Sequence, residues 1–267
     1  MGVRRFRLAL AAGLIAALAT MVAASADFAW DSEATFDPPE PADSFGRAVD
    51  LDDPTLVTGA PSDDTLLANA GAVWVHTRDD EGAWSFVVKL NASDAAAGDQ
   101  FGSSVAVEAD TLVAGAPFAD DGEGAVYVFN RSPGGLWSQS ARLSPAASPG
   151  AVNFGSSVGL AGNTIVIGAP AAGTGSVYVF NADGEGVWSE TTVLVPTDAE
   201  ADDFAGTSVA LSGDTILVGA SLEDAAGASS GSVYAFVRAG DGTWSQQAKL
   251  IASDAAAGDL FGDAVAL

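Results

Sequence analysis

The sequence predicts an all-β protein, a β-propeller built from four-stranded antiparallel blades, and three observations carry that prediction. First, short sequences return in the same order at regular intervals: Phe-Gly, Gly-Ala-Pro, an aromatic segment and a tryptophan. Second, each unit holds four short apolar or alternating segments with turn residues between them. Third, no stretch shows a sustained helical period. Four strands per unit of this length are typical of a propeller blade.

Phe-Gly, or a near equivalent, opens each unit. It begins at Phe45, Phe101, Phe154, Phe204 (Phe-Ala-Gly) and Phe261, so the spacing is nearly even. Gly-Ala-Pro follows at 59–61, 115–117 and 168–170, with Gly-Ala-Ser at 219–221. We therefore expect four complete repeats, at approximately residues 43–98, 99–151, 152–201 and 202–258, and a partial repeat at 259–267.

Turn chemistry separates the strands inside each unit. Pairs such as Ala109-Asp110 and Gly162-Asn163, between the first and second segments, suit tight hairpins. "RSPGGLW", "NADGEGVW" and "RAGDGTW" break the third segment from the fourth. Phe beside Gly lets a ring pack between blades while two backbones approach closely. We expect the tryptophans at 84, 137, 188 and 244 to be buried and to hold the blades together.

Phe-Gly followed at a fixed spacing by Gly-Ala-Pro, as at 101–102 and 115–117, resembles the FG-GAP repeat. This repeat is the blade unit of integrin α-subunit propellers and of many exported bacterial and archaeal proteins. Many FG-GAP blades carry a calcium loop between the first two strands. The equivalent turns here hold only "DDP", "EAD", "AGN" or "SGD", whereas a calcium loop needs about a dozen residues. The usual calcium sites are therefore expected to be absent. We assign no metal or cofactor, and Ca²⁺ bound elsewhere stays an open alternative.

The first 26 residues are interpreted as a secretory signal peptide, followed by the propeller at 27–267. Basic residues at the start precede an apolar run from Leu8 and a small-residue cleavage site at Ala24-Ser25-Ala26. An uncleaved membrane anchor is the alternative. We expect the protein to be secreted or held at the cell surface.

Both ends of the propeller are expected to be partial. Trp30 precedes Phe45 at nearly the spacing that separates each later tryptophan from its Phe-Gly. "WDSEATF" is therefore interpreted as the fourth strand of a blade, and "FGDAVAL" at 261–267 as a first strand. Together they predict an incomplete ring, either truncated or open.

The charge balance is strongly acidic. Without Arg4, Arg5 and Arg7, 35 acidic residues face the 7 that remain of 10 basic ones, so neither nucleic acid nor an anionic membrane surface is an expected partner. Solubility accounts for this excess, and cation binding is the alternative. Cysteine is absent, which excludes disulfides and thiolate chemistry. The single histidine, His76, aligns with Phe129 of the next repeat, so packing is favoured over chemistry.

An up-and-down blade places its second-to-third loop and the links between blades on one face. The stretch from Gly-Ala-Pro to the third strand shortens from the first repeat to the third, so this face is where binding loops are expected. Segments 144–153 and 171–175 carry no charge and predict an uncharged sector near the third blade. The candidate ligand or cation residues on this face are Asp94, Asp99, Asp120, Asp121, Asp198, Asp202, Asp203, Asp254 and Asp259.

Four of these residues lie in an octapeptide, "ASDAAAGD", that occurs at 92–99 and again at 252–259. The first copy holds Asp94 and Asp99, and the second holds Asp254 and Asp259. It links the last strand of one blade to the Phe-Gly of the next. Its aspartates either cap turns, which we favour, or bind a cation.

No catalytic residues are predicted. Gly155-Ser156-Ser157-Val158-Gly159 matches the nucleophile elbow of serine hydrolases, but the preceding repeat has "GSSVAV" at the same place and no helix follows. The integrin-like resemblance implies an exported, non-enzymatic binding or adhesion module whose partner is an extracellular protein or glycan. A structural surface repeat without a discrete ligand, or an appendage of a larger extracellular enzyme, is the alternative.

Overall fold

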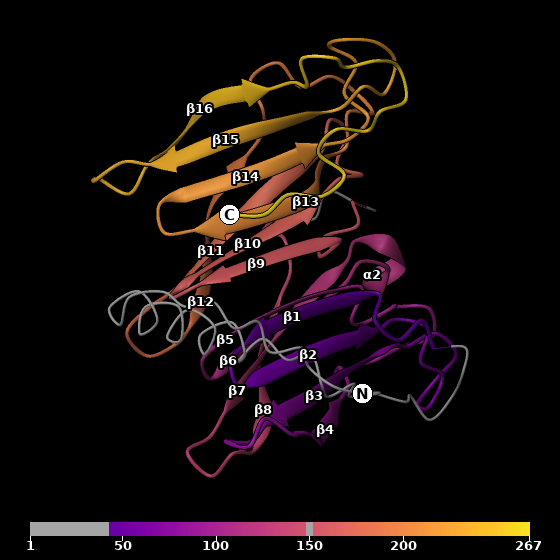
Figure 1. Ribbon diagram of the computed structural model, residues 1–267, viewed down its shortest axis with the longest axis vertical. Helices are drawn as coiled ribbons and strands as arrows, with labels where there is room; N and C mark the ends of the chain where they lie inside the picture. The colour runs from indigo at the N-terminus through magenta and orange to yellow at the C-terminus, as the bar shows by residue number, and fades with distance from the viewer. Residues whose placement is uncertain (1–42, 148–151) are drawn as a thin grey trace, which may run out of the picture. The chain divides into compact units, whose positions relative to one another are not determined.

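The computed structural model describes residues 43–147 and 152–267, which form four separate four-stranded antiparallel sheets (Figure 1). Every sheet keeps its strands in chain order, so each is an up-and-down blade. This confirms the predicted all-β propeller of four-stranded blades, here in an incomplete form. No helix in the described ranges is long and apolar enough to cross a membrane. The signal peptide and the strand predicted at Trp30 lie outside these ranges.

The bounds of the strands repeat closely from blade to blade. The first blade contains β1 (Ala48–Asp52), β2 (Thr55–Ala60), β3 (Ala72–Arg78) and β4 (Trp84–Leu90). The second contains β5 (Ser104–Glu108), β6 (Thr111–Ala116), β7 (Ala125–Arg131) and β8 (Trp137–Leu143), with one short turn, α2 (Ala119–Gly122). The third contains β9 (Ser157–Ala161), β10 (Thr164–Ala169), β11 (Ser176–Ala182) and β12 (Trp188–Leu194). The fourth contains β13 (Ala205–Ser212), β14 (Thr215–Ala220), β15 (Ser232–Arg238) and β16 (Trp244–Leu250).

The Phe-Gly pairs lie at the junctions between blades, as predicted. Phe101 and Phe154 are fully buried, and their backbones bridge in parallel to Gly71 and Gly124 of the preceding blade. Each ring meets a tyrosine of its own blade edge-on, with Phe154 and Tyr178 ring centroids 5.2 Å apart. The apolar clusters around these rings draw residues from two successive blades. The core is therefore a series of junctions between neighbouring blades.

The glycine one residue before the end of each second strand lets two blades touch backbone to backbone. A Cβ at Gly59, Gly115 or Gly168 would lie 2.0 Å from the carbonyl oxygen of the glycine in the next Phe-Gly position. A serine of the first strand satisfies that carbonyl: Ser104 Oγ donates to the Gly155 carbonyl at 2.7 Å. Ser157 and Ser208 repeat this bond at the next two junctions. Close approach and hydrogen bonding together explain why Gly-Ala recurs at this place.

Three sequence expectations are wrong in detail. In the fourth repeat the residue bridging to the preceding blade is Ala205, paired with Gly175, whereas Phe204 occupies the position of Gln100 and shares its positive φ. The four tryptophans that open the fourth strands are half-buried, because these are the outermost strands of the blades. Residues 261–267 make a single bridge at Phe261 and form no strand, since no neighbouring strand in the described chain pairs with them.

Candidate functional site: the loop face

We define the loop face as the blade ends that carry the second-to-third loops and the links between blades, and the hairpin face as the opposite ends. On the hairpin face the first-to-second turns (53–54, 109–110, 162–163, 213–214) all have one length, and so do the third-to-fourth hairpins (79–83, 132–136, 183–187, 239–243). On the loop face the second-to-third loops span 61–71, 117–124, 170–175 and 221–231, and the third is the shortest. The length variation within the blades is therefore confined to one kind of loop, on one face.

A cation recurs on the fourth strand, at the edge of the loop face. Lys89, Arg142 and Lys249 pair in register with the aromatic residue of the third strand, which is Trp74, Tyr127 or Tyr234. Each cation lies over that ring, 5.3, 5.8 and 5.4 Å from its centroid. An aromatic face attracts a cation. The ring therefore helps to hold the charge at the base of the loops.

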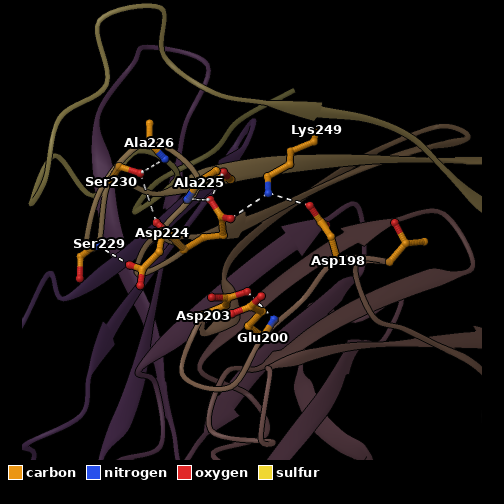
Figure 2. A network of polar contacts seen from close by, with 12 residues as sticks. Asp198, Glu200, Asp203, Asp224, Ala225, Ala226, Ser229, Ser230 and Lys249 are labelled. Atoms are coloured by element: carbon orange, nitrogen blue, oxygen red, sulfur yellow. Dashed lines mark hydrogen bonds and ion pairs between the residues drawn. The ribbon is translucent and has the colours of Figure 1, made fainter.

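Each of these cations binds acidic residues of the loops, and we call the arrangement a clamp. In the fourth blade Lys249 Nζ lies 2.7 Å from the Asp198 carboxylate and 2.8 Å from that of Glu223. Figure 2 shows the Lys249 ammonium with dashed lines to two carboxylates, one of them Asp198. Asp198 belongs to the link that enters the blade, and Glu223 to its second-to-third loop. The clamp therefore ties two parts of the loop face together.

The charges of the fourth-blade clamp stabilise one another. Burial alone would raise the pKa of Glu223, but hydrogen bonds from Lys249, Ser232 and the Ala225 N–H overcome it and lower the pKa. The hydrogen bond from Lys249 likewise lowers the pKa of Asp198. Burial would lower the pKa of Lys249, yet its carboxylate partners raise it. All three groups are therefore charged at neutral pH.

The first two blades build the same clamp from different acids. Lys89 pairs with Asp63, whose side chain is only 1% exposed, and donates to Thr65 Oγ1 at 2.6 Å. Arg142 pairs with Asp94 of the entering link at 2.9 Å and with Asp120 of the loop. Acids of both the link and the loop are thus used in the second and fourth blades.

The third blade has no such clamp among its described residues. Val193 of β12 stands opposite Tyr178, where the other blades have lysine or arginine. Ala147 replaces the link aspartate, and the loop at 170–175 contains no acid. Val193 and Val195 are 40% and 44% exposed. The described part of the predicted uncharged sector therefore coincides with the blade in which all clamp partners are missing.

The nine candidate aspartates occupy three kinds of position. Asp99, Asp203 and Asp259 each accept a hydrogen bond at 2.7 Å from a backbone N–H within their own link, and so cap a turn. Asp94, Asp120 and Asp198 are clamp residues. The other three, which make no side-chain hydrogen bond or ion pair within the described residues, are Asp121, Asp202 and Asp254. No three acids or histidines in residues 43–147 and 152–267 gather to hold a metal ion.

Sequence reasoning missed the clamp cations, although the repeat alignment contained their signal. The fourth strands read "WSFVVKL", "WSQSARL", "WSETTVL" and "WSQQAKL", and the sixth residue is basic in every blade except the third. In a chain with so few basic residues, a basic side chain at one repeated position indicates a structural or binding role. Reading charge by repeat position would have identified it.

Breaking the first-blade clamp is expected to destabilise the protein. In Lys89→Met the Asp63 carboxylate stays buried without its cation, so we expect a loss of about 2–3 kcal/mol in the free energy of unfolding at pH 7.5. Burial would raise the pKa of Asp63, but hydrogen bonds from Lys89 and Thr65 hold it below the usual value. This stabilisation therefore fades as the pH falls through that lowered pKa. Urea unfolding at pH 7.5 and at a series of pH values from 4 down to 2.5 measures both effects.

The matched control is Arg78→Met, because Arg78 and Asp53 form an exposed pair with side chains 43% and 63% exposed. An exposed pair contributes less than about 1 kcal/mol. Equal losses in the two variants would contradict the importance of burial at the clamp.

His76 gives the chain a stability that depends on pH near neutrality. The residue is 4% exposed, its ring meets Phe86 edge-on at 5.8 Å, and burial lowers its pKa. The unfolded chain therefore binds the proton more readily, and stability falls as the pH drops below the ordinary histidine value of about 6.5. His76→Phe places there the residue found at Phe129, Phe180 and Phe236, and should remove this component.

Thermal unfolding of both proteins at pH 7.5 and pH 5 tests this expectation. The melting temperature of the wild type relative to His76→Phe should fall on acidification. A difference that does not change with pH would show that His76 does not titrate in this range.

The fold and the loop face define a repeat-based binding or structural module, built from tandem four-stranded blades. The FG-GAP repeat model matches residues 37–76, 84–129, 137–180, 188–236 and 244–267, and the chain belongs to the FG-GAP repeat family. Propellers of this family are generally non-catalytic. Each internal match begins at a fourth strand and ends in the third strand of the next blade, so it spans a junction.

Solved structures similar to this chain include a protein from Lactobacillus plantarum and Sqt1 from Chaetomium thermophilum. The protein from Lactobacillus plantarum matches with a TM-score of 0.52 and 15% identity over 79% of this chain and 57% of its own, which shows the fold alone. Sqt1 from Chaetomium thermophilum matches with a TM-score of 0.49 and 17% identity over 80% of this chain and 50% of its own. The chain thus spans about half the length of these structures. No curated protein sequence matches it.

Proposed function

We propose that the protein is an exported, non-enzymatic binding or adhesion module, and that an extracellular protein binds the uncharged sector of its loop face. We define this sector by Ala146, Ala147, the loop 170–175, Val193 and Val195. The observation that carries the proposal is the loss of every clamp partner in the third blade alone. Exposed valines without charge, flanked by clamped acidic loops, match the apolar core and polar rim of protein interfaces.

The acids around the sector favour a partner with a basic rim. The clamps hold acids of the second and fourth blades in place. These side chains would therefore lose little conformational entropy when a partner binds. Attraction between opposite charges accelerates association and weakens with salt. Of the two partner classes, protein and glycan, exposed aliphatic side chains in this sector favour protein.

Saturable binding tests the proposal. The labelled chain is titrated on cells of the organism that produces it, and bound label is measured by flow cytometry. Val193→Lys places in the third blade the cation that the other blades carry, and should weaken binding about tenfold, since a charge enters an apolar contact. Val187→Lys is the control, because Val187 is 62% exposed on the hairpin face of the same blade.

Binding that does not saturate would favour the structural repeat instead. Binding that Val193→Lys and Val187→Lys weaken equally would place the contact elsewhere. Catalysis by a domain covalently joined to this one would favour the appendage of an enzyme.

A further inference from the structure

A groove lies between the third and fourth blades, toward the hairpin face. It has a volume of about 490 Å³. The third blade contributes Asn181 of β11 and Thr191 and Thr192 of β12, and the fourth contributes Arg238, Gly242, Thr243 and Trp244. The groove is separate from the uncharged sector, which lies on the loop face.

The first and second blades form a matching groove of about 220 Å³. Arg131, Gly135 and Trp137 on its one wall correspond to Arg238, Gly242 and Trp244. On the other wall, Thr77 and Val87 stand where the third blade has Asn181 and Thr191. One wall of each groove is therefore built from equivalent residues, whereas the residues of the other wall differ. That second wall is more polar in the groove between the third and fourth blades.

One hydrogen bond across the junction distinguishes the two grooves. In the smaller groove, Arg131 Nη1 donates across the junction to Thr55 Oγ1 at 3.3 Å. In the larger groove, the equivalent Thr164 hydroxyl accepts from Asn181 Nδ2 at 2.8 Å, within its own blade. Arg238 makes no bond to the third blade among the described residues. The arginine therefore does not bridge the larger groove.

The larger groove combines an aromatic ring with polar groups and no net charge. Arg238 Nε and Nη2 both lie 2.7 Å from the Asp214 carboxylate, which neutralises the guanidinium. The guanidinium lies 5.5 Å from the centroid of the Trp244 ring. Thr191 already donates to the Val179 carbonyl at 3.1 Å. The hydroxyl of Thr192 and the remaining Arg238 N–H groups can bind a ligand.

We propose that this groove binds a neutral carbohydrate residue. A sugar ring presents C–H groups that pack on indole and hydroxyls that bond to threonine and arginine. The volume falls in the range of about 300–1,000 Å³ that small-ligand sites occupy, whereas the smaller groove falls below it. The chain has a formal net charge of −25, which disfavours an anionic ligand.

Saturation-transfer NMR with the methyl glycosides of glucose, galactose, mannose and N-acetylglucosamine tests the proposal. At least one glycoside should show saturable transfer. Trp244→Leu should weaken it about tenfold, because the ring contact is lost. Thr192→Val should also weaken it, and it keeps the fold intact because the first blade has Val88 at that position. Asn181→Thr frees Thr164 for Arg238 and should close the groove.

Trp137→Leu in the smaller groove is the matched control and should leave binding unchanged. Absence of transfer from all four glycosides to the folded wild type would overturn the proposal. Equal losses in Trp137→Leu and Trp244→Leu, or no loss in Thr192→Val, would also overturn it. Val193→Lys should not affect sugar binding, so this result and that of the protein-binding test are independent.

Discussion

Gly168→Ala is expected to cost about 3 kcal/mol or more in the free energy of unfolding, since overpacking a junction forces backbone to move. The added Cβ would lie 2.0 Å from the Gly206 carbonyl oxygen and 2.3 Å from Ser157 Oγ. Neither atom can yield freely, because Ser157 Oγ donates to that same carbonyl at 2.8 Å. The third and fourth blades would have to separate. Urea unfolding followed by tryptophan fluorescence measures the loss.

Gly184→Ala is the control in the same blade. Gly184 lies in the third-to-fourth hairpin, and a Cβ added there would meet no atom within 4 Å. Its change in stability should therefore stay within about 0.5 kcal/mol. A small loss at both glycines would show that the blades adjust easily and that the close approach is not required.

Phe154→Ala is expected to cost about 3–5 kcal/mol, as removing a buried aromatic ring leaves a cavity. Phe154 is fully buried between the second and third blades and contacts the rings of Tyr178 and Phe180, with centroids 5.2 and 6.0 Å away. Repeat proteins are stabilised by contacts between neighbouring units. Loss of the Phe154 ring should therefore make the two halves of the described chain unfold less cooperatively.

The measurement is urea unfolding, with both the midpoint and the slope recorded. A lower slope in Phe154→Ala would indicate that the halves unfold separately. Phe118→Ala is the control, because Phe118 is 47% exposed in the second-to-third loop, and it should change stability by less than about 1 kcal/mol. Similar losses in the two variants would contradict a special role for the junction ring.

The blades and their junctions could be predicted because they depend on local, repeated chemistry. Turn pairs such as Gly162-Asn163 and the glycines beside Phe101 and Phe154 report backbone geometry directly. The junction residue Ala205 could not be assigned from the sequence, because Phe204 lies one position before the one that the buried rings of Phe101 and Phe154 occupy in the earlier repeats. Its bridge to Gly175 settles the register.

The candidate site was predictable only in part, because its features depend on contacts across strands and blades. The missing charge near the third blade was visible in the sequence. The pairing of Lys249 with both Asp198 and Glu223 was not, since 51 and 26 residues separate the partners. No bond from Arg238 crosses the groove beside Trp244 to the Thr164 hydroxyl, which accepts from Asn181 instead, and side-chain geometry makes that choice.

The family match has a consequence for how such chains change in length. Each internal matched segment starts just after a third-to-fourth hairpin and contains the fourth strand, the link, the Phe-Gly position and three strands of the next blade. A gene duplication with its ends in two such hairpins would therefore copy an entire interface together with both surfaces that form it. The inserted unit would contact the blades on each side through the same kind of junction that already joins them. The number of blades can therefore change in evolution without new contacts having to arise.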